Sequence, residues 1–178
     1  MDRRLFLGIS LPQIIIKDIQ EIEESIGSQL FWNPIENLHI TALFLGLIEE
    51  EYLEKIYKIL DALKIGKFLI EIDKIDYSPG ERMLWLYFKE NDALKNFNKN
   101  IIEFLEKENV PFQKDNRGFD FLPHINLLKI RDEKFIMNNN KIPKAVDLKF
   151  QAEELNLYES MLGRSFVIYE IIKTKKLV

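Results

Sequence analysis

The sequence has no cysteine among its 178 residues. A chain without thiols cannot form disulfides, hold zinc through cysteine or use a cysteine nucleophile. It also lacks any apolar run that approaches the roughly 18 residues of a membrane-spanning helix. The short apolar run from Leu5 to Ile9 stops at Pro12 without a small-residue cleavage site, so it predicts a core strand rather than a signal peptide. We therefore expect a protein of the cytoplasm that does not enter a membrane.

An excess of positive charge is missing as well, because the formal net charge is −4 at pH 7. This total argues against a protein that coats nucleic acid through bulk positive charge, although it is compatible with a local basic cleft. The contents of 47% hydrophobic and 30% charged residues are ordinary for a globular protein. Since no low-complexity segment or long linker interrupts the chain, we expect residues 1–178 to form one bilobal domain.

Hydrophobic periodicity predicts that strands and helices alternate along the chain. We expect strands at residues 4–11, 38–47, 68–77, 82–89, 119–130, 146–158 and 165–173. We expect helices at residues 12–28, 52–66 and 91–105, the second ended by Gly66 and the third capped by Asn91 or Asp92. The order strand, helix, strand occurs twice, once from Leu5 and once from Leu84. This repeat predicts two β-α-β units related by a pseudo-two-fold axis, with a cleft between them.

Histidine occurs only twice, and both residues lie in similar short runs. The first run is Asn37-Leu38-His39-Ile40-Thr41, and the second is Leu122-Pro123-His124-Ile125-Asn126. Because side chains alternate along a strand, His39 shares a face with Thr41, and His124 shares a face with Asn126. Imidazoles ionise near neutral pH, so one can remove a proton while the other delivers one. Two such pairs facing one cleft would suit the hydrolysis of a phosphodiester, with the polar partners stabilising charge on the phosphate.

This pattern alone leaves a structural and a functional interpretation open. A lone histidine in an apolar strand is usually structural, but two in matching contexts within matching topology favour a functional pair. A metal site is less well supported, because two histidines without a third ligand fall short of the usual zinc set. Serine–histidine catalysis has no support, since the chain has no Gly-x-Ser-x-Gly motif.

The chain resembles the two-histidine phosphoesterase superfamily, and within it the RNA 2′,3′-cyclic phosphodiesterase family, which is also described as 2′-5′ RNA ligase. The family signature is a pair of His-x-Thr motifs, which stand here as NLHITALFLG (37–46) and FLPHINLLK (121–129). Three further segments also match: RRLFLGISLP (3–12), RMLWL (82–86) and LNLYESMLGRSFVIYE (155–170). The resemblance therefore covers nearly the whole chain.

This resemblance implies a bilobal α+β fold with a central cleft between antiparallel sheets. It implies that a 2′,3′-cyclic phosphate, on an RNA end or on a small cyclic nucleotide, is opened to a 2′-phosphate without metal or cofactor. Slow 2′-5′ ligation is implied as the reverse reaction. By the resemblance His124 is expected to be the base and His39 the acid, although the sequence does not assign these roles. We expect a monomer.

The resemblance also implies that Thr41 and Asn126 bind the phosphate. Asn126 stands where the family has threonine, and its amide can still bond a phosphate oxygen through two donors and one acceptor. Asparagine is longer and planar, however, so a binding module for nucleotides or RNA ends with reduced or lost turnover is the alternative function. Lys129 stands where the family often has arginine, and strand alternation predicts that it lies on the face opposite His124.

The remaining candidates have a structural alternative that is the more common one. Arg82 could meet an RNA phosphate or be a surface arginine at the start of a strand. Tyr158 could stack on a base or pack in the core. Arg117 and Arg164 could supply local positive charge or be simply solvated.

Overall fold

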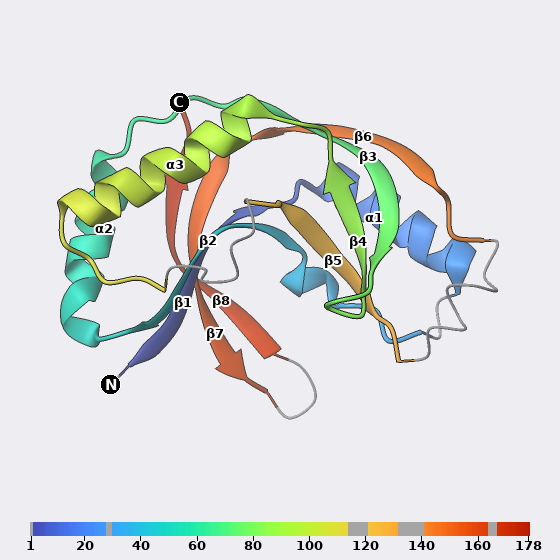
Figure 1. The fold of residues 1–178 in the computed structure, drawn as a ribbon, viewed down its shortest axis with the longest axis horizontal. Helices are drawn as coiled ribbons and strands as arrows, with labels where there is room; N and C mark the ends of the chain where they lie inside the picture. Colours follow the sequence, from blue (N-terminus) through green and yellow to red (C-terminus); the bar gives the residue numbers. More distant parts are fainter. Residues whose placement is uncertain (1, 28–29, 114–120, 132–140, 164–166) are drawn as a thin grey trace.

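The computed structural model describes residues 2–27, 30–113, 121–131, 141–163 and 167–178. In these residues the strands form two antiparallel sheets of four strands each (Figure 1). The first sheet has the order β2-β1-β7-β8 and contains β1 (Arg3–Ser10), β2 (His39–Ile48), β7 (Glu154–Leu162) and β8 (Val167–Lys176). The second has the order β5-β4-β3-β6 and contains β3 (Phe68–Ser78), β4 (Met83–Phe88), β5 (His124–Lys129) and β6 (Ala145–Ala152). The predicted α+β class with two antiparallel sheets is confirmed.

The two sheets repeat the same topology. In each, a strand leads through a helix to an antiparallel neighbour, as β1-α1-β2 in one sheet and β4-α3-β5 in the other. Both histidine-bearing strands, β2 and β5, therefore lie at the edges of their sheets, and these two edges contact each other. The repeat inferred from element order is thus present in the fold, and it brings the two motif strands together.

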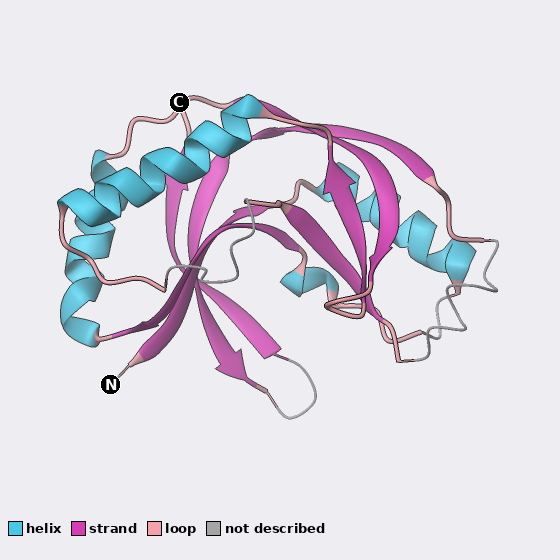
Figure 2. Ribbon diagram, viewed as in Figure 1, coloured by secondary structure: helices cyan, strands magenta, loops and turns pink. Residues whose placement is uncertain are grey.

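The helices cross between the halves of the chain. These helices are α1 (Gln13–Ile26), α2 (Leu53–Ala62) and α3 (Asp92–Lys107). Helix α1 contacts β6 of the second sheet, whereas α3 contacts α2 and β2 beside the first sheet as well as β3. Figure 2 shows α2 and α3 on one side of the molecule and α1 on the other. Ile15, Ile19 and Ile26 form the buried face of α1, at the helical spacing that the sequence indicates.

Several predicted boundaries differ from the structure, including the end of the last strand, β8, at Lys176 rather than at residue 173. The strand expected at 146–158 is two strands in different sheets, β6 and β7, separated by Glu153. Helix α2 ends at Ala62 rather than near Gly66, because Leu63 has an extended backbone with φ −61° and ψ 128°. Strand β5 begins at His124, and the start expected at residue 119 lies outside the described residues. The predicted cap of α3 is confirmed, since Asn91 Oδ1 accepts from the Leu94 amide at 3.1 Å.

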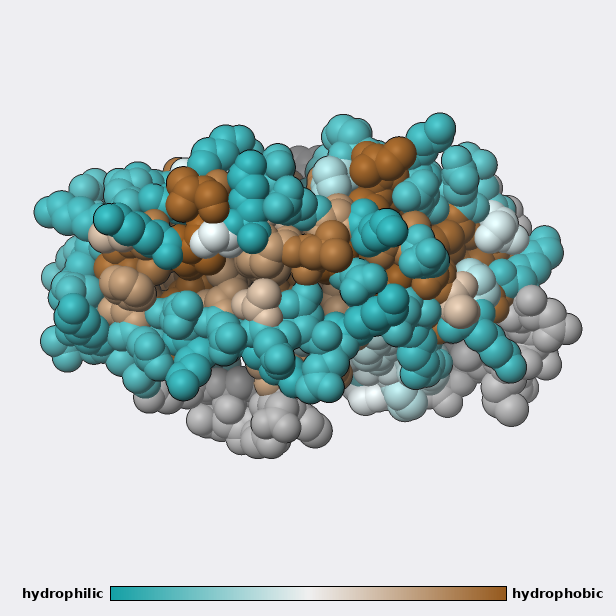
Figure 3. Space-filling model, turned by 90° about the horizontal axis from the view of Figure 1, so that it is seen from above, coloured by the Kyte–Doolittle hydropathy of each residue, from teal (hydrophilic) through white to brown (hydrophobic). Residues whose placement is uncertain are grey.

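Apolar residues also reach the surface. On the face seen from above in Figure 3, they form a band along the length of the molecule, with hydrophilic residues on both sides of it. Among the described residues, no helix combines the length and the apolar character needed to cross a lipid bilayer.

Candidate active site

His39 is held by two hydrogen bonds at the start of β2. Its ring Nδ1 lies 2.7 Å from the carbonyl oxygen of Asn37, and its Nε2 lies 3.1 Å from Thr41 Oγ1. Since a carbonyl oxygen only accepts, Nδ1 carries the proton and Nε2 has the lone pair when the ring is neutral. The structure therefore brings His39 and Thr41 together on one face, with Nε2 as the nitrogen available for proton transfer.

His124 has the same anchoring at the start of β5. Its Nδ1 lies 2.9 Å from the carbonyl oxygen of Leu122, again two residues earlier in the chain. The same argument assigns the proton to Nδ1 and leaves Nε2 as the nitrogen that can exchange a proton. Asn126 lies on the same face, because it pairs across the sheet with Trp85 while His124 pairs with Tyr87. The two motifs thus repeat in side-chain geometry as well as in sequence.

Each imidazole rests on aromatic rings of its own sheet. The His39 ring centroid lies 4.7 Å from that of Phe6 and 5.1 Å, edge-on, from that of Tyr169. The His124 ring stacks on Trp85 at 3.7 Å with 16° between the planes. Sequence reasoning missed these aromatic supports, because they come from strands that pair only in the folded protein. They fix the planes of the rings and hold the nitrogen edge of each in one orientation.

Because Gly8 has no side chain, the His39 and Tyr158 rings can lie close to the backbone of β1. Gly8 pairs with Thr41 across β1 and β2. A Cβ atom at Gly8 would lie 3.0 Å from the carbonyl oxygen of Ile40, 3.1 Å from Tyr158 Cε2 and 3.4 Å from His39 Cδ2. A glycine within an apolar strand indicates such a close approach, and this signal could have identified the position in advance.

The outer edges of the two motif strands receive hydrogen bonds from the opposite half of the chain. On β2, Asn98 Nδ2 donates to the Ala42 carbonyl at 2.5 Å and the Gln113 amide to the Leu45 carbonyl at 2.8 Å. On β5, the side chain of Asn33 donates to the Asn126 carbonyl at 2.9 Å. Reciprocal bonds of this kind hold the two edges in a fixed relation. Sequence reasoning did not identify them, because the donors lie far from the motifs along the chain.

The two imidazoles interact electrostatically. Burial lowers the pKa of His39 from 6.5 to about 4, although the hydrogen bond to the Asn37 carbonyl acts in the opposite direction. The charge of His124 lowers this pKa further. The contact between β2 and β5, the strands that carry the two rings, is the geometric basis of this interaction. In the unliganded protein His39 is neutral at pH 7.

We expect an NMR titration of the unliganded protein to show His39 ionising near pH 4 rather than near 6.5. Between these two values the unfolded chain binds more protons than the folded one, so the free energy of unfolding should decrease as the pH falls through this window. Inorganic phosphate should raise the pKa, because an anion beside the ring favours the imidazolium. A His39 resonance that titrates near 6.5 without phosphate would contradict this description of the site.

Tyr158 and Lys129 take positions that the sequence did not fix. Tyr158 is only 4% exposed and its ring stacks on Phe6 at 4.7 Å, so the structure favours packing over base stacking.

The prediction that Lys129 lies on the face opposite His124 is wrong. Leu127 has no partner where β5 pairs with β4. Trp85 pairs with Asn126, but Met83, two residues earlier on β4, pairs with Lys129, three residues later on β5. This β-bulge returns Lys129 to the face of His124, about 13 Å farther along the sheet, since their partners Tyr87 and Met83 are four residues apart on β4.

Arg82 lies at the same far end of the sheet. Its Nη2 donates to the Arg131 carbonyl at 2.8 Å, and it precedes β4 with a positive φ of 54°. The structure therefore places neither Arg82 nor Lys129 beside the imidazoles. Arg117 and Arg164 lie outside the described residues.

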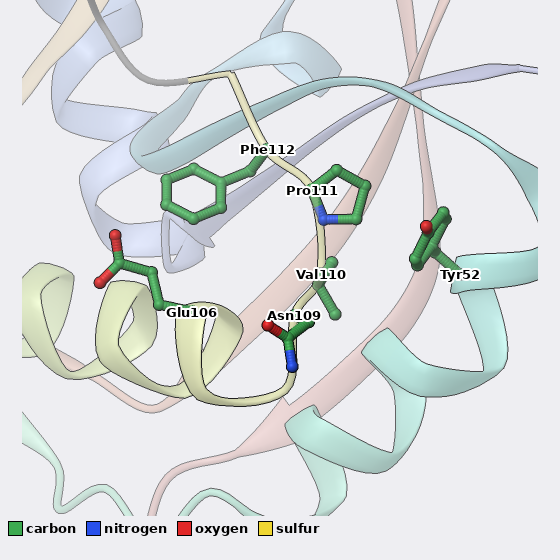
Figure 4. A pocket seen from close by; sticks show the side chains of 6 residues that line it. All are labelled: Tyr52, Glu106, Asn109, Val110, Pro111 and Phe112. Atoms are coloured by element: carbon green, nitrogen blue, oxygen red, sulfur yellow. The ribbon is translucent and has the colours of Figure 1, made fainter.

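A separate hollow of about 370 Å³ lies at the end of α3 (Figure 4). It is lined by Tyr52, Glu106, Asn109, Val110, Pro111 and Phe112. None of the residues predicted for the site lines it, so it does not coincide with the paired histidines. Within the described part of the chain, no three histidine, aspartate or glutamate side chains come together as a possible metal site.

Comparisons of the sequence with known families and proteins give consistent matches. The sequence model of the AKAP7 2′5′ RNA ligase-like domain matches residues 6–175. The RNA 2′,3′-cyclic phosphodiesterase of Methanocaldococcus jannaschii is 34% identical, over 96% of this chain and 98% of that protein. The protein of the same name from Archaeoglobus fulgidus is 26% identical, over 97% of this chain and 93% of that protein.

Solved structures agree in fold. The structure of E. coli LigT complexed with 3′-AMP matches with a TM-score of 0.80 at 24% identity, covering 99% of both chains. A structure described as a phosphoesterase matches with a TM-score of 0.79 at 23% identity, also covering 99% of both chains. At these identities the likeness establishes the fold and the bilobal arrangement of the sheets.

Proposed function

Because the chain belongs to the two-histidine phosphoesterase family, through its match to the AKAP7 2′5′ RNA ligase-like domain, we propose that it hydrolyses 2′,3′-cyclic phosphates of RNA ends or nucleosides. The product is a 2′-phosphate. The relatives named RNA 2′,3′-cyclic phosphodiesterase support this substrate class, since one of them is 34% identical over almost all of the chain.

The observation that carries the proposal is a pair of imidazoles that are anchored alike on two edge strands in contact with each other. The charge of His124 lowers the pKa of His39, and both rings have Nδ1 bound to a backbone carbonyl. Two Nε2 atoms directed at one phosphorus centre can serve the attacking and the leaving oxygen. Thr41 and Asn126, each two residues along the same strand, are the proposed donors to the non-bridging oxygens.

In the proposed reaction, a water molecule attacks phosphorus while Nε2 of His124 takes its proton. The bond from phosphorus to the 3′ oxygen breaks, and Nε2 of His39 delivers a proton to that oxygen. His39 is neutral in the unliganded protein, because burial lowers its pKa to about 4. The anionic phosphate favours the imidazolium, so His39 takes up its proton when substrate binds. Burial thus couples the acid to the presence of substrate.

We propose that the reaction needs no metal. Each general acid or base contributes a factor of about 10² to 10⁴ in rate, and the strain of a five-membered cyclic phosphate lowers the barrier that remains. A 5′-hydroxyl in the place of water would give a 2′-5′ linkage by the same chemistry, and it would be slow because water is in large excess. We also propose that residues 1–178 act as one monomeric bilobal domain, since α1 and α3 contact the sheets of opposite halves.

The proposal is tested by incubating the purified protein with adenosine 2′,3′-cyclic phosphate, with and without EDTA. We expect adenosine 2′-phosphate as the only product, formed at the same rate in both samples. Chromatography that separates the 2′ and 3′ isomers is the measurement. Formation of the 3′ isomer, or activity abolished by EDTA, would contradict the proposed mechanism.

One feature favours a second candidate function, a binding module for nucleotides or RNA ends. Asn126 stands at the second motif's donor position, and its planar amide extends farther from the backbone than a threonine hydroxyl. A displaced phosphate would still bind but would turn over slowly. Binding of the cyclic nucleotide without detectable product in the same experiment would support the module over the enzyme.

A further inference from the structure

An exposed aromatic ring lies against an arginine at the far end of β5. Phe31 is 54% exposed, and the guanidinium carbon of Arg131 lies 3.9 Å from its ring centroid. Arg82 joins this pair through its hydrogen bond to the Arg131 carbonyl. A large apolar ring that remains exposed with a guanidinium stacked on it is suited to contact with a further planar group.

The arrangement of β5 connects this end of the sheet to the histidine. Trp32 forms an isolated antiparallel bridge with Leu128, so the adjacent Phe31 lies beside Lys129. The β-bulge at Leu127 places Lys129 on the same face as His124. Phe31, Arg82, Lys129 and Arg131 therefore form one surface cluster, here called the far-end cluster, about 13 Å along the strand from His124.

The far-end cluster contains three cationic side chains, Arg82, Lys129 and Arg131. Among the described residues, ion pairs with carboxylates involve cations such as Arg3, Lys74 and Lys173, but none of the three cations of this cluster. The chain as a whole is acidic, with a formal charge of −4, so such a concentration is not a consequence of composition. Positive charge interleaved with an exposed aromatic ring is the usual chemistry for binding single-stranded nucleic acid.

We propose that the far-end cluster is a subsite for the RNA strand that precedes the cyclic phosphate, an inference that rests on the proposed function. With the terminal phosphate between the histidines, the strand follows the exposed face of β5 toward Lys129. Phosphates contact Lys129, Arg82 and Arg131, and a base stacks on Phe31. A mononucleotide held at the histidines does not reach this distance, so the subsite selects RNA ends over small cyclic nucleotides.

The test compares two substrates in two variants. The substrates are adenosine 2′,3′-cyclic phosphate and a pentanucleotide RNA that ends in a 2′,3′-cyclic phosphate. For the double variant Phe31→Ala/Arg131→Ala we expect KM for the pentanucleotide to rise about tenfold or more, with kinetics on the mononucleotide unchanged within about twofold. Lys173→Ala is the matched control, because Lys173 also lies over an aromatic ring, Tyr57 at 5.4 Å, but is paired with Asp61.

Salt dependence separates phosphate contacts from a structural effect. For binding of a fluorescent pentanucleotide, the slope of log affinity against log salt should decrease by about 0.7 for each phosphate contact that Arg131→Ala or Lys129→Ala removes. An unchanged pentanucleotide KM, or equal losses on both substrates, would overturn the subsite. If the wild-type protein turns over neither substrate, the proposed function fails, while the titration still decides the subsite: equal binding by wild type and the double variant would refute it.

Discussion

Replacing His39 or His124 by alanine is expected to lower the turnover of a 2′,3′-cyclic nucleotide by at least about two orders of magnitude. Each imidazole is proposed to transfer one of the two protons that the reaction moves. Steady-state kinetics with adenosine 2′,3′-cyclic phosphate measures the effect. Because the two residues act on one transition state, the double variant should lose less than the product of the single losses.

Controls must separate catalysis from folding. The His39 ring packs against both Phe6 and Tyr158, so alanine there leaves a cavity that weakens the first sheet. His39→Gln and His124→Gln retain side-chain volume but cannot exchange a proton near neutral pH. We expect these variants to unfold near the wild-type temperature and to be as inactive as the alanine variants. Activity close to wild type in either glutamine variant would remove that histidine from the mechanism.

Much of the fold could be predicted from local patterns. The helical spacing of Ile15, Ile19 and Ile26 indicates α1, and the alternation from Phe68 indicates β3. The separation of β6 from β7 leaves only a small local signal, because the apolar alternation stops at Ala152, is interrupted by Glu153 and Glu154, and resumes in the opposite phase at Leu155. Which sheet a strand joins depends on its pairing partners, and these are not encoded in its own periodicity.

The candidate site shows the same limit. His39 and His124 could be identified because they are the only histidines and lie in matching runs. The face of Lys129 could not, because a β-bulge depends on how β5 pairs with β4 and reverses the alternation that the sequence alone suggests. The bonds from Asn33 and Asn98 to the motif strands likewise join segments that are distant in the chain. Local sequence thus identifies the reacting groups, while pairing between strands determines their positions.

Gly8→Val is expected to reduce turnover about tenfold or more. Gly8 lies on β1 and pairs with Thr41 of β2, so this variant tests how the pairing of the two strands positions His39. The Cβ atom would lie 3.0 Å from a backbone carbonyl and 3.4 Å from His39 Cδ2, and the γ carbons of valine would extend beyond it. The backbone cannot give way cheaply and Tyr158 Cε2 would lie 3.1 Å from the Cβ atom, so the Tyr158 and His39 rings, which pack against each other, must shift, and Nε2 would lose its alignment. Overpacking of this kind also costs about 1–3 kcal/mol of stability.

The matched comparison is Gly8→Ala with Gly80→Ala, because a Cβ at Gly80 would have no heavy atom within 4 Å. Gly80→Ala should leave kinetics and stability unchanged, Gly8→Ala should show a partial loss and Gly8→Val the largest. If the ring is displaced in Gly8→Val, His39 becomes exposed to solvent, which a loss of stability alone would not cause. Its pKa should then rise from about 4 toward 6.5 in an NMR titration of the folded variant. A valine variant with wild-type turnover and an unchanged His39 pKa would show that the ring does not depend on the space at Gly8.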